Sequence, residues 1–267
     1  MLDMVILGLV QGLTEFLPVS STAHLIFAEA FLGISRPGIL LEAVLHLGTA
    51  LAALVVLWGE VRKLVTAWGR SVTRQPADAV AQSYGRLAWL IILITAITAA
   101  AGLTLERPLE QMFGSVRGTA AQLMLTGVLL LFANERGRRG MLDAAPQDAL
   151  VIGIAQAVAI IPGISRSGTT ITAGIWMGLR QEEAARLSFL AAIPAVAGAG
   201  LLGLKDLRLG LAMGYTPAQL LTGFVVAAVS GGLAIRWLLS VLRRGRLVYF
   251  AAYCLLAGAA VLVFAKG

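Results

Sequence analysis

The chain has 267 residues, of which 58% are hydrophobic and 13% are charged, and its mean hydropathy is +0.86. The charged fraction is about half of what a soluble domain carries, and one soluble core cannot hold so much apolar surface. The formal net charge of +7 does not indicate nucleic acid, because the basic residues stand in short loops between apolar segments. Composition therefore predicts an all-α polytopic membrane protein whose basic loops face anionic lipid headgroups.

The first segment is apolar but too short to span a membrane. Residues 1–17 extend about 25 Å as a helix, against about 30 Å for the hydrocarbon core. Pro18 ends that helix because it has no N–H and clashes with the preceding turn. A second short helix, capped by a hydroxyl at 20–22, continues to about Leu32. Two half-length helices around a polar break predict a re-entrant hairpin, which is tolerated only beside protein or a water-filled cavity.

Full spans and a second interrupted segment follow. The six expected spans lie at about 40–58, 87–105, 119–133, 184–204, 220–239 and 247–265. The second interruption falls between apolar pieces at 149–161 and 169–179, which Pro162 and Gly163 separate. The predicted architecture is six transmembrane helices plus two re-entrant helical hairpins, forming a single membrane domain over residues 1–267.

The distribution of basic residues predicts the topology. The loop expected at 62–86 carries five Lys and Arg residues, and placing it in the cytoplasm puts 14 such residues inside and six outside. The outside residues are Arg36, Arg107, Arg117, Lys205, Arg208 and Lys266. The other basic loops that fall inside include Arg136 and Arg246. Arg166, in the second break, belongs to neither side. The first hairpin then enters from outside and the second from the cytoplasm.

The two halves, about 1–140 and 141–267, are therefore expected to be inverted copies. Weak sequence symmetry agrees, because GLVQ in the first half matches GIAQ in the second, and PVSS after the first break matches PGIS after the second. In such folds the two helix breaks meet near the membrane midplane, where binding sites are built.

The first break carries groups suited to nucleophilic chemistry. Glu15 is costly in an apolar helix, and such a carboxylate usually faces an interior cavity. Gln11 lies one turn earlier on the same face. Ser21 and His24, within ten residues of Glu15, offer a nucleophile and a proton-transferring group. The neighbouring hydroxyls, on Ser20 and Thr22, are capping groups that could also contact a ligand.

A second histidine, His46, lies in the first full span. We interpret it as a satisfied interior group, because that is the usual role of a lone membrane histidine. Glu42, one turn earlier, is expected either to pair with His46 or to face the cavity.

The second break reads PGISRSG and suits an anion. Gly163 and Gly168 permit tight turns and close approach of a ligand. Ser165 and Ser167 supply hydroxyl donors, and the helix that follows points backbone N–H groups at the break. Arg166 adds a permanent cation with the fork geometry that phosphate accepts, although a simple ion pair with Glu15 is the alternative role. The first break thus carries a nucleophile and the second break carries groups that bind an anion. This combination suits phosphoryl transfer.

Both breaks resemble one known family, the bacitracin-resistance type of undecaprenyl-diphosphate phosphatase. That family has a Glu/Gln-x-x-x-Glu motif running into FLPVSST-x-H, here residues 11–24, and PGxSRSG, here residues 162–168. Gln11 replaces the first acid of the motif, a variant that the family accepts. The resemblance covers the whole chain in length, span number and repeat organisation.

The resemblance implies hydrolysis of undecaprenyl (C55) diphosphate to undecaprenyl phosphate and inorganic phosphate, which recycles the lipid carrier of peptidoglycan synthesis. It implies residence in the bacterial inner membrane with the site facing the periplasm. It also implies dependence on a divalent cation, Mg²⁺ or Ca²⁺, although no metal-ligand cluster in the sequence specifies one. Expected partners are the lipid substrate and the bilayer, with no nucleic acid; the sequence leaves open whether the protein is a homodimer.

Ser21 is expected to attack the terminal phosphorus while His24 and Glu15 move and orient protons. Attack by His24 itself, or by a water that Glu15 activates, stays open. The alternative function is a transporter or flippase of a polyprenyl phosphate or another anion, because inverted repeats with broken helices are typical of secondary transporters.

Overall fold

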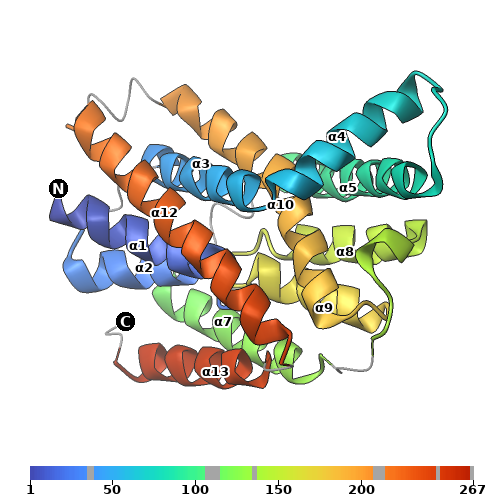
Figure 1. Ribbon diagram of the computed structural model, residues 1–267. Helices are drawn as coiled ribbons and strands as arrows, with labels where there is room; N and C mark the ends of the chain where they lie inside the picture. The colour runs from blue at the N-terminus through green and yellow to red at the C-terminus, as the bar shows by residue number, and fades with distance from the viewer. Residues whose placement is uncertain (35–38, 106–114, 134–136, 207–213, 245–246, 265–267) are drawn as a thin grey trace.

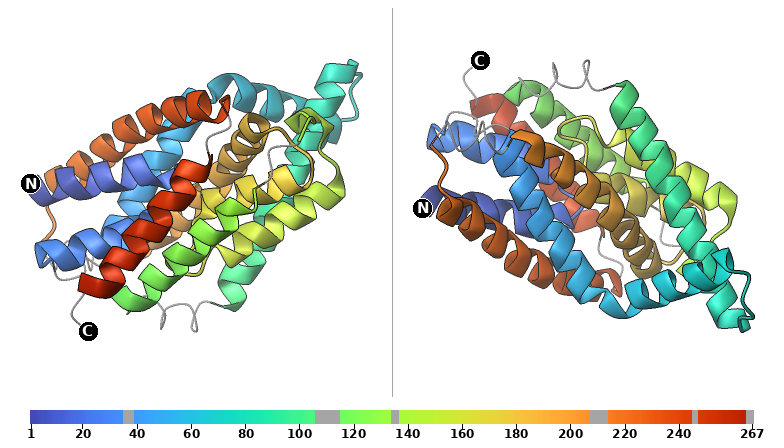
Figure 2. Two further views of the ribbon diagram at one scale, coloured as in Figure 1. Left: turned by 90° about the horizontal axis from the view of Figure 1, so that it is seen from below. Right: turned by 90° about the horizontal axis from the view of Figure 1, so that it is seen from above.

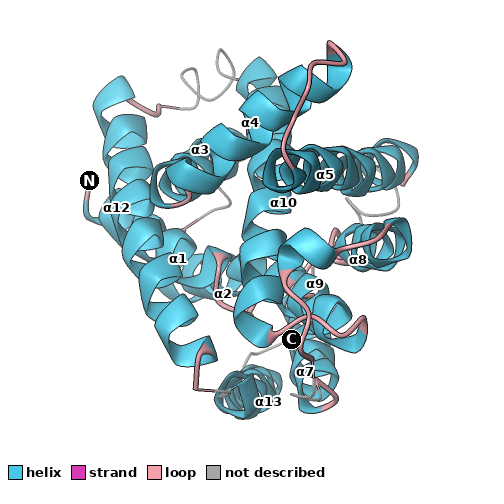
Figure 3. Ribbon diagram, turned by 45° about the vertical axis from the view of Figure 1, so that its right-hand side comes forward, coloured by secondary structure: helices cyan, strands magenta, loops and turns pink. Residues whose placement is uncertain are grey.

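The structure, a computed structural model, describes all but six short segments of the chain. The described residues are 1–34, 39–105, 115–133, 137–206, 214–244 and 247–264. Within these ranges the chain forms helices and connecting loops, with an isolated bridge between Arg139 and Leu179 (Figure 3). The predicted all-α class is confirmed. Some basic residues of the expected loops lie outside the described part: Arg36, Arg107, Arg136, Arg208, Arg246 and Lys266.

The first half of the chain begins with two short helices and continues through longer ones. These are α1 (Leu2–Glu15), α2 (Ser21–Leu32), α3 (Ile39–Val56), α4 (Trp58–Val72), α5 (Ala79–Thr104) and α7 (Val116–Leu131). The start of α1 and the end of α13 lie at the same end of the molecule, opposite the turn between α4 and α5 (Figures 1 and 2).

The second half repeats this order of short and long helices. It contains α8 (Pro146–Val158), α9 (Arg166–Trp176), α10 (Gln181–Gly203), α12 (Pro217–Leu242) and α13 (Leu247–Phe264), with short 3-10 turns at Met141–Asp143 and Leu204–Asp206. The two interrupted segments that the sequence predicts are therefore present as α1–α2 and α8–α9.

Several helices are suited to a lipid environment. In the described ranges, α5, α10, α12 and α13 are long and apolar enough to cross a membrane, and the bent pair α3–α4 adds a fifth candidate. One side of α12 exposes a large apolar residue at every fourth position: Leu221, Val225, Val229, Leu233 and Trp237. A continuous apolar stripe of this kind would aggregate in water, so it fits a face that contacts lipid.

The expected loop at 62–86 is wrong, because most of it is helical. The chain bends by 83° after α3 and continues as α4, and α5 begins at Ala79 rather than near Leu87. Apolar residues of α4 recur at helical spacing, with Val61, Leu64 and Trp68 on one face and basic residues on the other. The Asp78 side chain caps α5 by accepting a hydrogen bond from the N–H of Ala81 at 2.7 Å, which explains the earlier start.

Small residues hold α1 against α12. A Cβ added to Gly12 would lie 2.0 Å from Ser230 Oγ and 2.6 Å from the Ala227 carbonyl oxygen, so only glycine fits there. Gly8, one turn earlier, approaches Gly223 in the same way. Ser230 Oγ donates to the Val226 carbonyl and to the Gly8 carbonyl. This close packing of small residues fixes the position of α1 and therefore of the first break at its end.

We expect Gly12→Ala to destabilise the protein by about 1–3 kcal/mol, since the added methyl group must push α1 away from α12. Thermal unfolding of the purified protein in detergent measures the change. Gly69→Ala in α4 is the matched control, because an added Cβ there meets nothing within 4 Å. A Gly12→Ala variant that unfolds at the same temperature as Gly69→Ala would contradict the tight packing.

Candidate active site

The two helix breaks lie against each other, as the repeated pattern predicts. Arg166 Nη2, at the start of α9, donates to Glu15 Oε1, at the end of α1, at 2.6 Å. Beside this ion pair, Ser167 Oγ donates to the Leu17 carbonyl oxygen at 2.7 Å. Side chains of the second break therefore bind both a side chain and the backbone of the first.

Local capping explains why the chain breaks at these points. The Ser20 and Ser165 side chains accept hydrogen bonds from N–H groups in the first turns of α2 and α9 respectively. Ser20 has a φ of 64°, a conformation that is rare and strained for a residue with a side chain. Such strain persists only where the surrounding structure holds it, and it is common at functional sites.

Glu15 is the centre of the polar cluster. Its side chain is almost buried, yet both oxygens are fully engaged. Oε1 accepts from Arg166, and Oε2 accepts from Ser21 Oγ at 2.6 Å and from Gln11 Nε2 at 2.9 Å. A carboxylate that accepts a hydrogen bond from a hydroxyl is positioned to take its proton, so the geometry of Ser21 and Glu15 is that required of a nucleophile and its base.

A polar cavity of about 280 Å³ opens at this cluster. Six of the residues predicted for the site line it: Glu15, Ser20, Ser21, Thr22, Ser165 and Arg166. Other helices add the polar side chains of Glu42, His46, Thr98 and Gln156. The wall from α10 is apolar and consists of Ala195, Val196 and Ala199. The cavity is therefore polar where the two breaks meet and apolar on one side.

The start of α9, beside this cavity, carries hydrogen-bond donors that have no acceptor among the described residues. Arg166 Nη1 is buried and has no partner among the described residues, although Nη2 is bound to Glu15. The backbone N–H groups of Ser165 and Gly168 bind the side-chain oxygens of Thr126 and Ser165. In the described part of the chain, the N–H groups of Arg166 and Ser167 remain without an acceptor. Donors at a helix N-terminus beside an unpaired guanidinium nitrogen suit a phosphate group.

His24 lies apart from the cavity. Its Nδ1 is 2.8 Å from the Ser20 carbonyl oxygen, and its Nε2 is 2.7 Å from the Tyr253 hydroxyl of α13. The two rings stack with centroids 5.6 Å apart. Since a carbonyl only accepts, Nδ1 carries the proton, and Nε2 of the neutral ring accepts from Tyr253. Both ring nitrogens are therefore occupied, and the His24 ring braces the turn that carries Ser20 and Ser21.

The remaining predicted site residues also stand behind the cavity rather than on its wall. Gln11 is fully buried beneath Glu15. A Cβ on Gly163, whose φ is +94°, would lie 2.5 Å from the Thr119 carbonyl oxygen, so this glycine allows close approach to α7. Gly168 packs in the same manner against Thr126, and Ser167 binds the Leu17 carbonyl. These residues shape the second break around its neighbours.

His46 differs from the interior role expected for it, because the structure places it in the cavity. Its Nε2 lies 3.8 Å from Glu15 Oε2, and its Nδ1 lies 2.7 Å from the Glu42 carbonyl oxygen. Glu42 lines the same cavity. The sequence contains a weak signal for this placement. One face of an otherwise apolar helix carries polar groups at Glu42, His46 and Thr49.

The described residues contain no cluster of three side chains typical of a metal site. In the described part of the chain no three His, Cys, Asp or Glu side chains are grouped so that they could hold an ion. Both oxygens of Glu15 are already engaged. In other proteins Mg²⁺ is often held by one or two carboxylates together with substrate phosphates.

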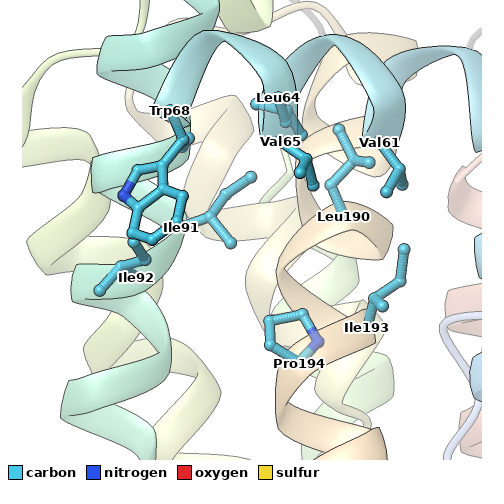
Figure 4. A pocket seen from close by; sticks show the side chains of 10 residues that line it. Val61, Leu64, Val65, Trp68, Ile91, Ile92, Leu190, Ile193 and Pro194 are labelled. Atoms are coloured by element: carbon cyan, nitrogen blue, oxygen red, sulfur yellow. The ribbon is translucent and has the colours of Figure 1, made fainter. Parts of the chain in front are cut away.

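A second hollow, of about 290 Å³, is almost wholly apolar and lies away from this cluster. Figure 4 shows it between α4, α5 and α10, with Trp68, Ile91 and Pro194 among its lining side chains. It contains no group that could bind or cleave a phosphate. The polar cavity is therefore the candidate site for chemistry on a phosphate.

Fold and site together define a helical membrane protein with a polar cavity where two interrupted helices meet. The chain belongs to the family of the bacitracin resistance protein BacA, whose model matches residues 4–260. The resemblance carried by residues 11–24 and 162–168 is thus confirmed.

Three relatives that match nearly the whole chain carry the same name. A Moorella thermoacetica protein called undecaprenyl-diphosphatase is 42% identical over 266 residues, covering 98% of this chain and 97% of that protein. A Myxococcus xanthus protein of the same name is 40% identical over 265 residues, covering 98% of this chain and 88% of the relative. A Methanobrevibacter smithii protein, also so named, is 38% identical over 269 residues, covering 97% of this chain and 95% of the relative.

We expect Arg166→Ala to destabilise the protein by about 3–5 kcal/mol, because it leaves the buried Glu15 carboxylate without its counter-charge. Adding Glu15→Gln should recover part of this loss, since the charge is then gone. Unfolding of the single and double variants in detergent measures the coupling. Arg180→Ala is the control: its pair with Glu183 is 3.7 Å long and its side chain is 61% exposed, so it should cost less than about 1 kcal/mol. Equal losses for Arg166→Ala and Arg180→Ala would show that the buried pair is not critical.

Proposed function

We propose that this protein hydrolyses undecaprenyl diphosphate to undecaprenyl phosphate and inorganic phosphate, which returns the lipid carrier to peptidoglycan synthesis. The observation that carries this proposal is the contact between a hydroxyl and carboxylate pair, Ser21 and Glu15, and the Arg166 guanidinium in one cavity. Membership of the family and the shared name of relatives over the full chain give the lipid diphosphate as substrate.

The diphosphate enters the polar cavity and its polyprenyl chain stays among lipid and apolar helix surfaces. Arg166 Nη1 and the N–H groups of Arg166 and Ser167 are the donors for its oxygens. Ser165 and Thr22, which also line the cavity, add hydroxyl donors. These donors act where negative charge accumulates during transfer of a phosphoryl group, and in a cavity with little water they are worth most.

Ser21 attacks the terminal phosphorus in this mechanism. Its Oγ–H passes its proton to Glu15 as the new oxygen–phosphorus bond forms, and the electrons of the broken anhydride bond go to the departing polyprenyl phosphate. Water then hydrolyses the phosphoserine. The 2.6 Å contact from Ser21 to Glu15 supports this order. Water activated by Glu15 is the second candidate for the attacking group. Attack by His24 has less support, because both of its ring nitrogens are engaged by Ser20 and Tyr253.

The proposed arrangement in the membrane has six spans and two re-entrant hairpins, related as inverted repeats. Helix contacts support an internal repeat in which α1, α3 and α12 correspond to α8, α10 and α5. The helices α1 and α3 both pack on α12, and their counterparts α8 and α10 both pack on α5. The helix α4 has no counterpart in the described part of the second half. The count of basic residues supports a site that opens to the periplasmic side of the inner membrane.

A divalent cation enters the proposal only as a companion of the diphosphate. We expect hydrolysis to depend on Mg²⁺ or Ca²⁺ at concentrations that saturate the substrate, with the cation bound to the diphosphate. A carrier function remains the second candidate, because two broken helices that meet inside an internal repeat are also the architecture of secondary transporters.

Purified protein in detergent is expected to release inorganic phosphate from C55 diphosphate, where no gradient or sidedness exists. Arg166→Lys should lower kcat by about 10²-fold or more, because an ammonium cannot reproduce the two-pronged donor pattern of the guanidinium. Ser21→Ala should lose activity to a similar degree. Binding of the diphosphate without release by the unmodified protein would favour the carrier instead.

The chemical stability of a trapped phosphoenzyme distinguishes the attacking groups. If Ser21 attacks, rapid acid quenching should retain labelled phosphate on the protein, and peptide mapping should place it at residue 21. Acid-labile phosphate at residue 24 would disprove attack by Ser21. Full activity of Ser21→Ala without any phosphoenzyme would point to water.

A further inference from the structure

We propose that His46 is a positioning residue of the site, which accepts the proton that Glu15 takes from the attacking group. This inference rests on the proposed phosphatase function and adds to it a residue on α3 that the motifs of the two breaks do not contain. It depends on the placement of one ring nitrogen.

Hydrogen bonding fixes which nitrogen of His46 carries the proton. Nδ1 lies 2.7 Å from the Glu42 backbone carbonyl oxygen, which can only accept, so Nδ1 is the donor. In the neutral ring, Nε2 therefore has its lone pair free. The Nε2 atom lies 3.8 Å from Glu15 Oε2, the oxygen that accepts from Ser21 Oγ. The proposed transfer requires the two side chains to approach to hydrogen-bond distance.

The orientation of His46 is held from its own helix. The bond from Nδ1 to the Glu42 carbonyl oxygen, one turn earlier on α3, holds the ring. Its side chain is about a quarter exposed, toward the cavity that also contains Ser21 and Arg166. A histidine oriented by a backbone carbonyl through one nitrogen presents the other in a fixed direction, as is typical of proton-transferring histidines.

The proposed proton path returns Glu15 to its carboxylate form, so that it can accept a second proton. As the attacking oxygen bonds to phosphorus, its proton goes to Glu15 Oε2, and the anhydride electrons leave with the polyprenyl phosphate. The carboxylic acid then gives this proton to His46 Nε2, which forms an imidazolium and restores the carboxylate. In the second half-reaction Glu15 takes a proton from water and returns one to Ser21 Oγ, while His46 releases its own proton to solvent. The same path serves direct attack by water.

The charged groups around His46 come from few helices. Glu15 faces it from α1, Glu42 lies on its own helix, and Arg166 reaches the same cavity from α9. The α10 residues that line the cavity are apolar, and α5 and α8 contribute the uncharged Thr98 and Gln156. Within the described residues of this cavity, His46 is therefore the imidazole that stands beside two carboxylates and a guanidinium.

The sequence motif favours His24 for proton transfer, and the geometry separates the two histidines. His24 has both nitrogens engaged, by the Ser20 carbonyl and the Tyr253 hydroxyl. His46 has one nitrogen engaged and the other turned to Glu15. Only His46 can take a proton from Glu15 without first breaking a hydrogen bond of its own.

The test compares His46→Gln with His24→Gln in purified protein hydrolysing C55 diphosphate across a range of pH. We expect His46→Gln to lower kcat by about 10²-fold with little change in KM, since glutamine keeps polarity but cannot accept the proton. The acidic side of the pH profile of kcat should change in this variant, because the group that accepts the proton has been removed. His24→Gln, although it is expected to disturb the Ser20 turn, should leave that acidic limb in place.

Chemical rescue distinguishes proton transfer from a structural role. Added imidazole should restore part of the activity of His46→Ala, and should have no effect on His46→Gln, whose side chain fills the space. Unfolding temperatures of both variants report folding separately. Unchanged kcat and pH profile in His46→Gln, or loss of the acidic limb in His24→Gln instead, would overturn the proposal. Phosphate release by the wild type in the same assay tests the proposed phosphatase function itself. Failure of that function is therefore distinguishable from failure of the role proposed for His46.

Discussion

The buried pair of Glu15 and Arg166 is the interaction on which the rest of the structure depends. Taking a carboxylate or a guanidinium out of water costs several kcal/mol, and the two charges offset this only when their geometry and other hydrogen bonds are good. Glu15 meets that condition, because Ser21 and Gln11 also donate to it. Neither break is stable in an apolar interior without the other, so the pair joins two segments that are 151 positions apart.

Helices that carry no chemistry hold the two breaks in place. Small residues let α12 lie directly on α1, and α13 reaches the first break through Tyr253 on His24 and through Cys254 Sγ on the Pro18 carbonyl. On the other side, Thr126 of α7 accepts from the Ser165 N–H. A site that must direct hydrogen bonds to within a few tenths of an ångström needs such support, since broken helices are weakly constrained by their own backbone.

The interruptions also explain how polar chemistry is possible among apolar helices. A continuous span bonds all of its N–H groups internally, whereas the start of α9 leaves the N–H groups of Arg166 and Ser167 free in the described structure. These fixed donors need little reorganisation when a phosphoryl group transfers, and catalysis of that reaction rests mainly on such positioning. The strained Ser20 residue is a second result of building the site at a break.

The sequence by itself determined the all-α class, the two interruptions and the polar groups they carry, because these follow from hydropathy, proline and capping chemistry within short windows. It also indicated the family through two long motifs. It did not predict α4, since five basic residues between 62 and 86 look like a loop unless the helical spacing of Val61, Leu64 and Trp68 is weighed against them. It also could not assign the histidines. Only the tertiary structure decided that His24 turns to Tyr253 of α13 and His46 to Glu15, because such contacts depend on how helices distant in sequence pack together.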